Sequence, residues 1–282
     1  MNNNTFVVSD LDGTLLNNDG LLSKHSRTKL QRLINNGLNF TVASARSLHT
    51  ISYILQDLQL SLPVICLNGA YISDYNTKKH LVINEIQQEV RQGIRGYVEK
   101  HNVGVFISTH HNGEDFLFYN QINNGGLQWY YEDRIASNDQ RLKKTISIKE
   151  LRDHYITCFT FIDKEKKLLQ IKRELLDQFQ DKVEIHLFEN LYSRGWYWLT
   201  AHDYRATKDR AIQQLQDEFG HQDKELIVFG DHINDIKMFK IAHQCIAVQN
   251  ADERLKKHAH EVIGTNMEDS VANYLEAMFR PQ

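Results

Sequence analysis

The residues most suited to chemistry in this chain are two aspartates, Asp10 and Asp12, which stand directly behind an apolar run at residues 6–8. The run predicts a buried strand over residues 5–9. Side chains alternate along a strand, so both carboxylates are expected on the same side of its carboxyl end. Gly13 permits the sharp backbone turn that a site at a strand end needs. The segment therefore predicts two acids at one small site.

A second acidic cluster, with Asp231 and Asp235, follows another apolar run at residues 226–229. If the two strands are neighbours, the four carboxylates converge, and each raises the pKa of the others unless they share a cation. A set of oxygen ligands without a thiolate suits Mg²⁺, which usually takes one or two carboxylates together with a substrate phosphate. The two clusters together predict a Mg²⁺ site.

The elements that must position these clusters alternate between strands and helices. A turn signal at residues 17–20 predicts a short flap or hairpin beside the site. Further strands are expected at 38–43, 63–67, 226–229 and 245–248, with helices from 23 to 36, 47 to 58, 233 to 240 and 267 to 279. Such alternation is typical of a parallel sheet with right-handed crossovers, in which ligands lie beyond the carboxyl ends of the strands.

The pattern changes in the middle of the chain, between about residues 83 and 198. Strands are expected there at 103–109, 116–120, 155–162, 183–188 and 196–200, with helices near 85–100, 125–134 and 164–179. Strands joined by turns indicate an antiparallel α+β module inserted into the sheet domain. The expected division is therefore a core of residues 1–82 and 199–282 and an insert of residues 83–198.

Both ends of the chain, roughly residues 5–80 and 200–279, resemble the haloacid dehalogenase-like (HAD) superfamily and its Cof-type sugar-phosphatase branch with a type IIB cap. The segment 10–14 matches the family motif Asp-x-Asp-Gly-Thr, and the segment 230–235 matches Gly-Asp-x-x-Asn-Asp. The resemblance implies a Rossmann-like, doubly wound parallel sheet core. It also implies that the inserted α+β domain is a cap that covers the active site and selects substrates.

The resemblance further implies roles for the acidic residues. Asp10 would be the nucleophile, and Asp12 would be the general acid and base. Mg²⁺ would be held by the side chains of Asp10 and Asp231 and by the backbone carbonyl of Asp12. Asp235 would position the metal or Lys208 from outside the set of direct metal ligands.

Phosphate also requires neutral and cationic donors, which the resemblance places on Ser44, Lys208 and Asn234. Asn234 would orient phosphate or Asp231. Without the family motifs, Ser44 is equally suited to cap a helix, and a lone helical lysine such as Lys208 is usually solvated. Arg46 could bind phosphate with two hydrogen bonds or brace the two acidic loops through an ion pair, and bracing is slightly favoured.

The match is not complete at every position. Ala45 and Asp209 stand where the family has glycine after Ser44 and Lys208. The tripeptide at 68–70, Asn-Gly-Ala, is common in Cof-like chains but also fits an ordinary turn.

Composition limits the classes of protein that fit. The chain has 282 residues, of which 41% are hydrophobic and 24% charged, which is ordinary for a globular protein that buries a large core. A formal charge of −3 gives no electrostatic case for binding nucleic acid or an anionic membrane. Three widely spaced cysteines indicate buried thiols in a reducing compartment, so the cytoplasm is the expected location.

The predicted reaction is hydrolysis of phosphate monoesters of small metabolites, such as sugar phosphates, with an aspartyl-phosphate intermediate. Two alternatives remain open. A phosphotransferase or phosphomutase would use the same residues, and a catalytically silent binding protein could be built on the same scaffold. The physiological substrate and the oligomeric state stay undetermined by the sequence.

Overall fold

The computed structural model describes residues 4–145, 147–190 and 193–279. The contacts divide the chain into two compact units, Met1–Val82 with Ala206–Gln282 and Ile83–Arg205. The sequence placed the second border at residue 198, which lies inside strand β11 (Tyr197–Asp203). The border falls later because β11 pairs along its length with strands of the second unit.

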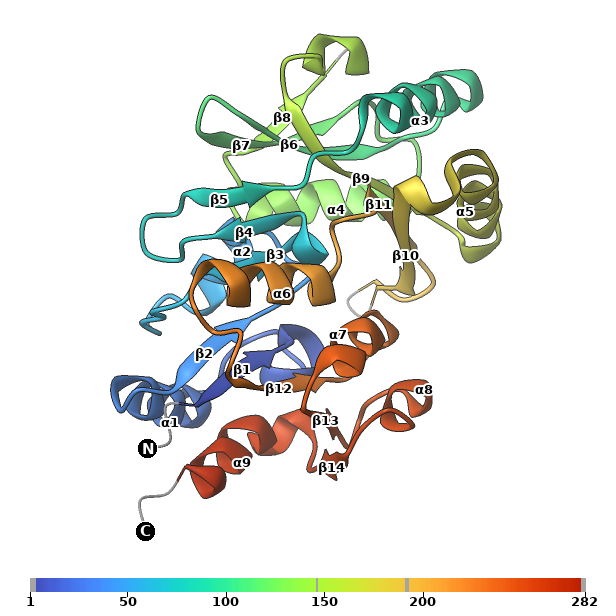
Figure 1. Ribbon diagram of the computed structural model, residues 1–282. Coiled ribbons are helices and arrows are strands. Elements are labelled where there is room, and N and C mark those ends of the chain that lie inside the picture. The colour runs from blue at the N-terminus through green and yellow to red at the C-terminus, as the bar shows by residue number, and fades with distance from the viewer. Residues whose placement is uncertain (1–3, 146, 191–192, 280–282) are drawn as a thin grey trace. The chain divides into compact units, whose positions relative to one another are not determined.

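A five-stranded parallel sheet forms the centre of the first unit, in the order β14-β13-β12-β1-β2 (Figure 1). Its strands are β1 (Thr5–Ser9), β2 (Asn39–Val42), β12 (Glu225–Gly230), β13 (Gln244–Val248) and β14 (Glu261–Ile263). Strand β1, between β12 and β2, is buried throughout and pairs Ser9 with Phe229 of β12 and Val42 of β2. The carboxyl ends of three strands therefore meet at one edge.

Helices cover both faces of this sheet. The connection from β1 leads to β2 on one side, and the connections from β12 lead to β13 and β14 on the other, so right-handed crossovers place their helices on opposite faces. Helix α1 (Lys24–Asn35) packs on α9 (Ser270–Met278), and α6 (Lys208–Glu218) packs on α7 (Ile236–Ile241). Two further helices are α2 (Leu48–Ile54) and α8 (Glu253–Lys256). The α/β class with a parallel sheet core is confirmed.

Two expectations for the first unit were wrong in detail. The third strand, β3 (Val64–Cys66), meets the parallel sheet only at an Ala43–Ile65 bridge and belongs to a three-stranded sheet with β4 (Tyr71–Ser73) and β5 (His80–Ile83). Of the flap or hairpin expected at residues 17–20, the hairpin is not formed, because residues 17–21 make a turn without paired strands. It is closed by the Asn17 N to Leu21 O hydrogen bond of 3.0 Å, and the Asn17 side chain holds its backbone.

The second unit contains the additional sheet that the sequence predicted, six strands in the order β10-β11-β9-β6-β7-β8. The strands are β6 (Phe106–His111), β7 (Glu114–Tyr119), β8 (Leu142–Lys144), β9 (Tyr155–Asp163), β10 (Val183–Glu189) and β11. All neighbours are antiparallel except β7 and β8, which run parallel. The order helix, strand, strand occurs twice, beginning at α3 (Gln88–His101) and at α5 (Glu165–Phe179).

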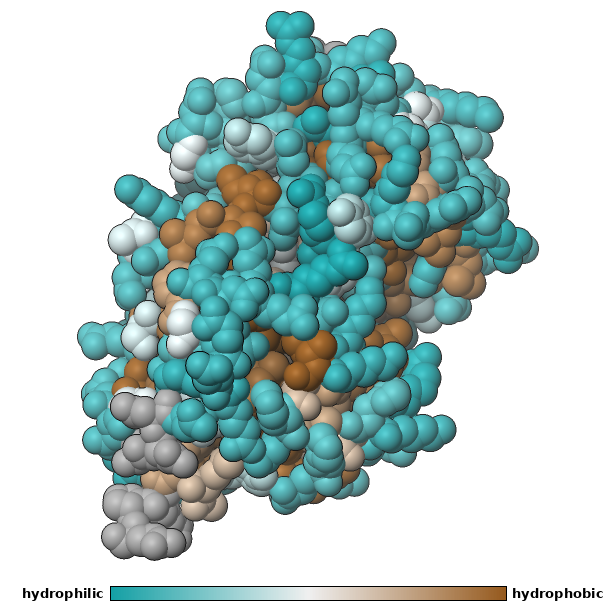
Figure 2. Space-filling model, viewed as in Figure 1, coloured by the Kyte–Doolittle hydropathy of each residue, from teal (hydrophilic) through white to brown (hydrophobic). Residues whose placement is uncertain are grey.

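Apolar side chains pack on both faces of this second sheet. On one face, α3 and α5 bury residues such as Ile94 and Leu175 against Phe159 and Leu199. On the other, α4 (Gly125–Ala136) covers an aromatic cluster that includes Trp198. Hydrophilic residues cover most of the surface visible in Figure 2, with separate apolar patches between them. In the part of the chain that the structure describes, no helix has the length and apolar content of a membrane span.

The core of the first unit should depend strongly on Phe40 of β2, whose side chain is fully buried. Substitution Phe40→Ala is expected to lower the free energy of unfolding of this unit by about 3–5 kcal/mol, because it leaves a cavity in a packed interior. Tyr53→Ala, at a position 70% exposed, should change it by less than about 0.5 kcal/mol. Urea unfolding followed by circular dichroism measures both, and similar losses in the two variants would contradict this packing.

Candidate active site

The parallel sheet brings together aspartates that are more than 200 residues apart in sequence, in agreement with the expected pairing of their strands. Asp10 follows β1, and its backbone N donates to Phe229 O of β12 at 3.0 Å. Asp231 follows β12 directly. The carboxylates of Asp10, Asp231 and Asp235 each offer an oxygen within 4.8 Å of the others.

The turn after β1 is shaped to leave room for Asp231. Gly13 has φ +74°, and a Cβ there would lie 2.3 Å from Asp231 Oδ2. Any other residue at this position would therefore clash with the carboxylate as well as strain the backbone. The next residue, Thr14, donates from Oγ1 to Asp231 Oδ1 at 3.1 Å. These two contacts explain why glycine and a hydroxyl follow the two aspartates.

Lys208 provides the cation at the centre of the carboxylate cluster. It is the first residue of α6, its side chain is 1% exposed, and its Nζ lies 2.6 Å from Asp10 Oδ1 and 2.7 Å from Asp235 Oδ1. The other oxygen of Asp235 accepts hydrogen bonds of 3.1 Å from the backbone N of Asp231 and of His232. Asp235 thus holds both the lysine and the loop that carries Asp231.

The electrostatics of the cluster follow from burial and from an excess of negative charge. Burial raises the pKa of Asp10 to about 7, and the charge of Asp235 adds to this effect. Burial and the charges of Asp10 and Asp235 raise the pKa of Asp231 to about 9. Burial lowers the pKa of Lys208, but the two carboxylates beside it outweigh burial and hold the pKa above its ordinary value.

When all three are ionised, the carboxylates around this one ammonium group leave two negative charges unbalanced. A divalent cation would remove that imbalance, and an all-oxygen ligand set suits Mg²⁺. Both oxygens of Asp235 already accept hydrogen bonds, so the carboxylate ligands for this cation are expected from Asp10 and Asp231. The residues present therefore fit a divalent metal.

Asp12 does not join this cluster, which corrects the expectation that four carboxylates converge. Its side chain turns toward Arg46, which donates from Nε to Asp12 Oδ2 at 2.7 Å and from Nη2 to Oδ1 at 2.6 Å. The reason is that the chain leaves the strand at Leu11 and enters an irregular helical turn, Leu11–Leu15, so the alternation of strand side chains ends. Its carboxylate is 33% exposed, whereas that of Asp10 is 8% exposed.

The two remaining predicted residues lie on neighbouring loops of the same unit. Ser44 follows β2, is fully buried, and accepts from Arg46 N through its Oγ at 3.1 Å. Asn234 donates from Nδ2 to Asn68 Oδ1 at 3.2 Å, while its own Oδ1 is buried and has no hydrogen-bond partner in the described residues. Sequence analysis assigned no role in the site to Asn68, although the Asn-Gly pair after the third strand marked the position.

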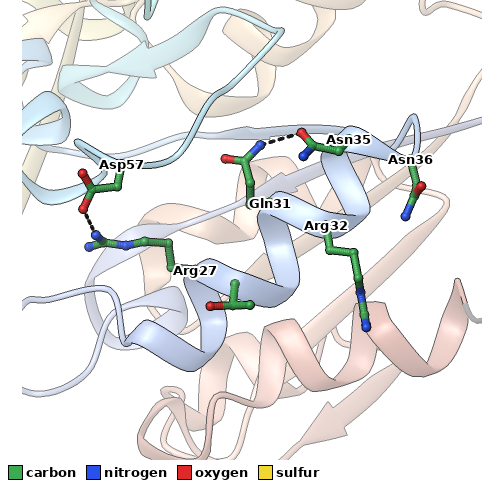
Figure 3. A pocket seen from close by; sticks show the side chains of 7 residues that line it. Arg27, Gln31, Arg32, Asn35, Asn36 and Asp57 are labelled. Atoms are coloured by element: carbon green, nitrogen blue, oxygen red, sulfur yellow. Dashed lines mark hydrogen bonds and ion pairs between the residues drawn. The ribbon is translucent and has the colours of Figure 1, made fainter.

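A surface hollow elsewhere on this unit, drawn in Figure 3, lies over α1 and shares no residue with the carboxylate cluster. Its lining groups bind one another, since Arg27 pairs with Asp57 and Gln31 Nε2 donates to Asn35 Oδ1 at 2.8 Å. We assign no ligand to this hollow, because its charged Arg27 and Asp57 side chains pair with each other.

Comparison with known proteins identifies the family of the chain. A family model described as haloacid dehalogenase-like hydrolase matches residues 7–275. The chain is 26% identical to a 5-amino-6-(5-phospho-D-ribitylamino)uracil phosphatase of Bacillus subtilis, with 98% of both chains covered. It is 25% identical to the pyridoxal phosphate phosphatase of Escherichia coli, with 95% of this chain and 96% of the other covered.

Solved structures show the same fold. One that is described as the HAD subclass IIB sugar phosphatase BT4131 matches with a TM-score of 0.77 at 21% identity, over 97% of this chain and 98% of the other. The match extends through the middle of the chain, for which the sequence offered no motif.

The unbalanced charge predicts that the metal-free protein becomes less stable as the pH rises. The pKa of Asp231 in the folded chain, about 9, lies above its ordinary value of 3.8, so the unfolded chain binds fewer protons between these values. Asp231→Asn should therefore raise the melting temperature in EDTA at pH 8, and by less at pH 5. Differential scanning calorimetry measures this, with Asp19→Asn at an exposed turn position as the control. A lower melting temperature for Asp231→Asn at pH 8 would contradict the charge argument.

Proposed function

Because the chain belongs to the family of haloacid dehalogenase-like hydrolases, we propose that it is a Mg²⁺-dependent phosphatase that acts on small phosphorylated metabolites through an aspartyl-phosphate intermediate. The observation that carries the proposal is the position of Asp10. Its carboxylate is buried, held by Lys208 Nζ at 2.6 Å, and grouped with Asp231 at the carboxyl edge of the sheet.

In the first displacement, an oxygen of Asp10 attacks phosphorus and the bond from phosphorus to the departing alkoxide breaks. Asp12 in its acid form gives its proton to that alkoxide. Arg46 donates a hydrogen bond to each oxygen of the Asp12 carboxylate, so the side chain has a defined orientation before it takes up the proton. The products of this step are the alcohol and an acyl phosphate on Asp10.

In the second displacement, the Asp12 carboxylate takes a proton from water while the water oxygen attacks phosphorus. The bond from phosphorus to Asp10 then breaks, which releases inorganic phosphate and restores both aspartates. Ser44, Lys208 and Asn234 are the proposed donors to the phosphoryl oxygens, and Asp235 keeps Lys208 in place. Such positioned donors commonly supply a large part of phosphoryl-transfer catalysis.

Asp10, Asp231 and the backbone carbonyl of Asp12 are the proposed Mg²⁺ ligands. When bound, the ion offsets the negative charge of the phosphoryl group and of the carboxylates. The fit rests on the two unbalanced charges of the cluster and on its all-oxygen composition.

The proposed substrates are phosphate monoesters of small organic metabolites. The relatives support this class, because their names specify a phosphoribitylamino-uracil and pyridoxal phosphate. We further propose a cytoplasmic location, on the ground that all three cysteines are buried free thiols.

A phosphate-release screen over a panel of phosphorylated sugars, nucleotides and cofactors, with and without Mg²⁺, tests this function. Release of free phosphate only in the presence of Mg²⁺ is the expected result. A second phosphorylated product in place of free phosphate would indicate a phosphotransferase or mutase. Failure to release phosphate from every substrate would favour the binding-protein alternative.

The nucleophile assignment predicts that Asp10→Asn reduces turnover to background, because an amide does not form the acyl phosphate. The matched control is Asp19→Asn, the same chemical change at an exposed turn position, which should keep wild-type activity. Steady-state phosphate release measures both variants, and calorimetry checks that each is folded. Substantial turnover by folded Asp10→Asn would rule out the mechanism.

Lys208→Met should lower kcat by about 10²- to 10³-fold, because it removes a buried cation beside the nucleophile. Lys240→Met, at an exposed position of α7, is the control and should leave the rate unchanged. Kinetic assays at saturating Mg²⁺ provide the comparison. Near-normal kcat in Lys208→Met would remove this lysine from the site.

A further inference from the structure

The turn Leu67–Gly69 lies at a junction of three loops that carry proposed phosphate donors, and its backbone is unusual. Leu67, Asn68 and Gly69 have φ values of +47°, +56° and +104°, so three successive residues lie in the left-handed region. This conformation is unfavourable for leucine, and strained backbone persists only where surrounding contacts enforce it. The contacts of the turn therefore indicate what it is for.

The turn is fixed first to the loop of Ser44. The backbone N of Asn68 donates to Ser44 O at 2.9 Å, and the backbone N of Leu67 donates to Arg46 O at 3.0 Å. Ser44 N in turn donates to Ile65 O at 3.0 Å. These three bonds fix the position of the Ser44 loop relative to the turn.

The side chain of Asn68 reaches the second loop. It is 3% exposed, and its Oδ1 accepts from Asn234 Nδ2 at 3.2 Å. This bond fixes the orientation of the Asn234 side-chain amide. It uses one of the two hydrogens of the NH₂ group and leaves the other for a second acceptor.

Gly69 meets the third loop. A Cβ on Gly69 would lie 2.6 Å from Thr207 O and 2.9 Å from Thr207 C and N. These are backbone atoms, which cannot rotate away as the end of a side chain can. Thr207 precedes Lys208 at the start of α6, so the absence of a side chain at Gly69 allows α6 to begin at the place from which Lys208 reaches Asp10.

We propose that Asn68 and Gly69 are positioning residues that set the relative places of Ser44, Asn234 and Lys208, and thereby the geometry in which the site receives a phosphoryl group. This inference rests on the proposed phosphatase function. Neither residue touches the reacting atoms in the proposed mechanism. Asn68 acts through Asn234, and Gly69 acts through Lys208.

The experiment on Asn68 is a double-mutant cycle. Asn68→Gly keeps a residue that adopts positive φ readily and removes only the side chain. It should weaken the binding of inorganic phosphate in the presence of Mg²⁺ by about five- to tenfold, the value of one hydrogen bond. If Asn68 acts through Asn234, the double variant Asn68→Gly/Asn234→Ala should bind phosphate no more weakly than Asn234→Ala alone. Additive losses in the cycle would overturn the proposal for Asn68.

The experiment on Gly69 compares Gly69→Ala with Gly220→Ala. Gly220 has φ +68° and no atom within 4 Å of an added Cβ, so this control also places alanine at a positive φ but without the contact. Gly69→Ala should lower kcat by at least about tenfold, since the displaced ammonium would lose part of its stabilising effect. Gly220→Ala should keep wild-type kcat. Equal kcat in the two variants would overturn the proposal for Gly69.

Failure of this inference is distinguishable from failure of the proposed function. If the wild-type protein neither releases phosphate from the substrate panel nor binds inorganic phosphate in calorimetry, the proposed function fails, and the inference fails with it. If the wild type is active and the variants behave like it, only the inference fails. Should Gly69→Ala not fold, the Asn68 cycle decides the matter.

Discussion

The site depends on one electrostatic constraint: three carboxylates, buried in Asp10 and Asp235 and half-buried in Asp231, surround the ammonium group of Lys208. Ionised carboxylates are costly to bury without compensating charge. The lysine balances one of them and fixes the orientation of Asp10. The remaining negative charge would favour a divalent cation, so the arrangement that costs stability is also the one that would hold the proposed metal.

The parallel sheet makes this concentration of charge possible. Adjacent parallel strands end at the same edge, so the acids that directly follow β1 and β12 lie close together. The loops that leave this edge are then held by a few specific contacts. Gly13 leaves space for Asp231, Asp235 holds both Lys208 and the backbone of residues 231–232, and the Asn68 turn joins the loops of Ser44 and Asn234.

The different roles that we propose for Asp10 and Asp12 follow from their different environments. Asp10 is buried beside a cation, whereas Asp12 is partly exposed and paired with Arg46. Two carboxyl groups two residues apart can therefore serve different chemical purposes, because the backbone turn at Leu11 sends their side chains to different partners.

The sequence alone was sufficient to predict the strands β1 and β12, the parallel sheet, the inserted second sheet and the family, because hydrophobic periodicity and short motifs are local properties of the chain. It also identified the residues of the carboxylate cluster together with Lys208. Only the tertiary structure decided that Asp12 turns to Arg46, that β3 leaves the parallel sheet, and that Asn68 contacts Asn234. These outcomes depend on how loops distant in sequence pack against one another, and that packing is set by contacts that no local pattern encodes.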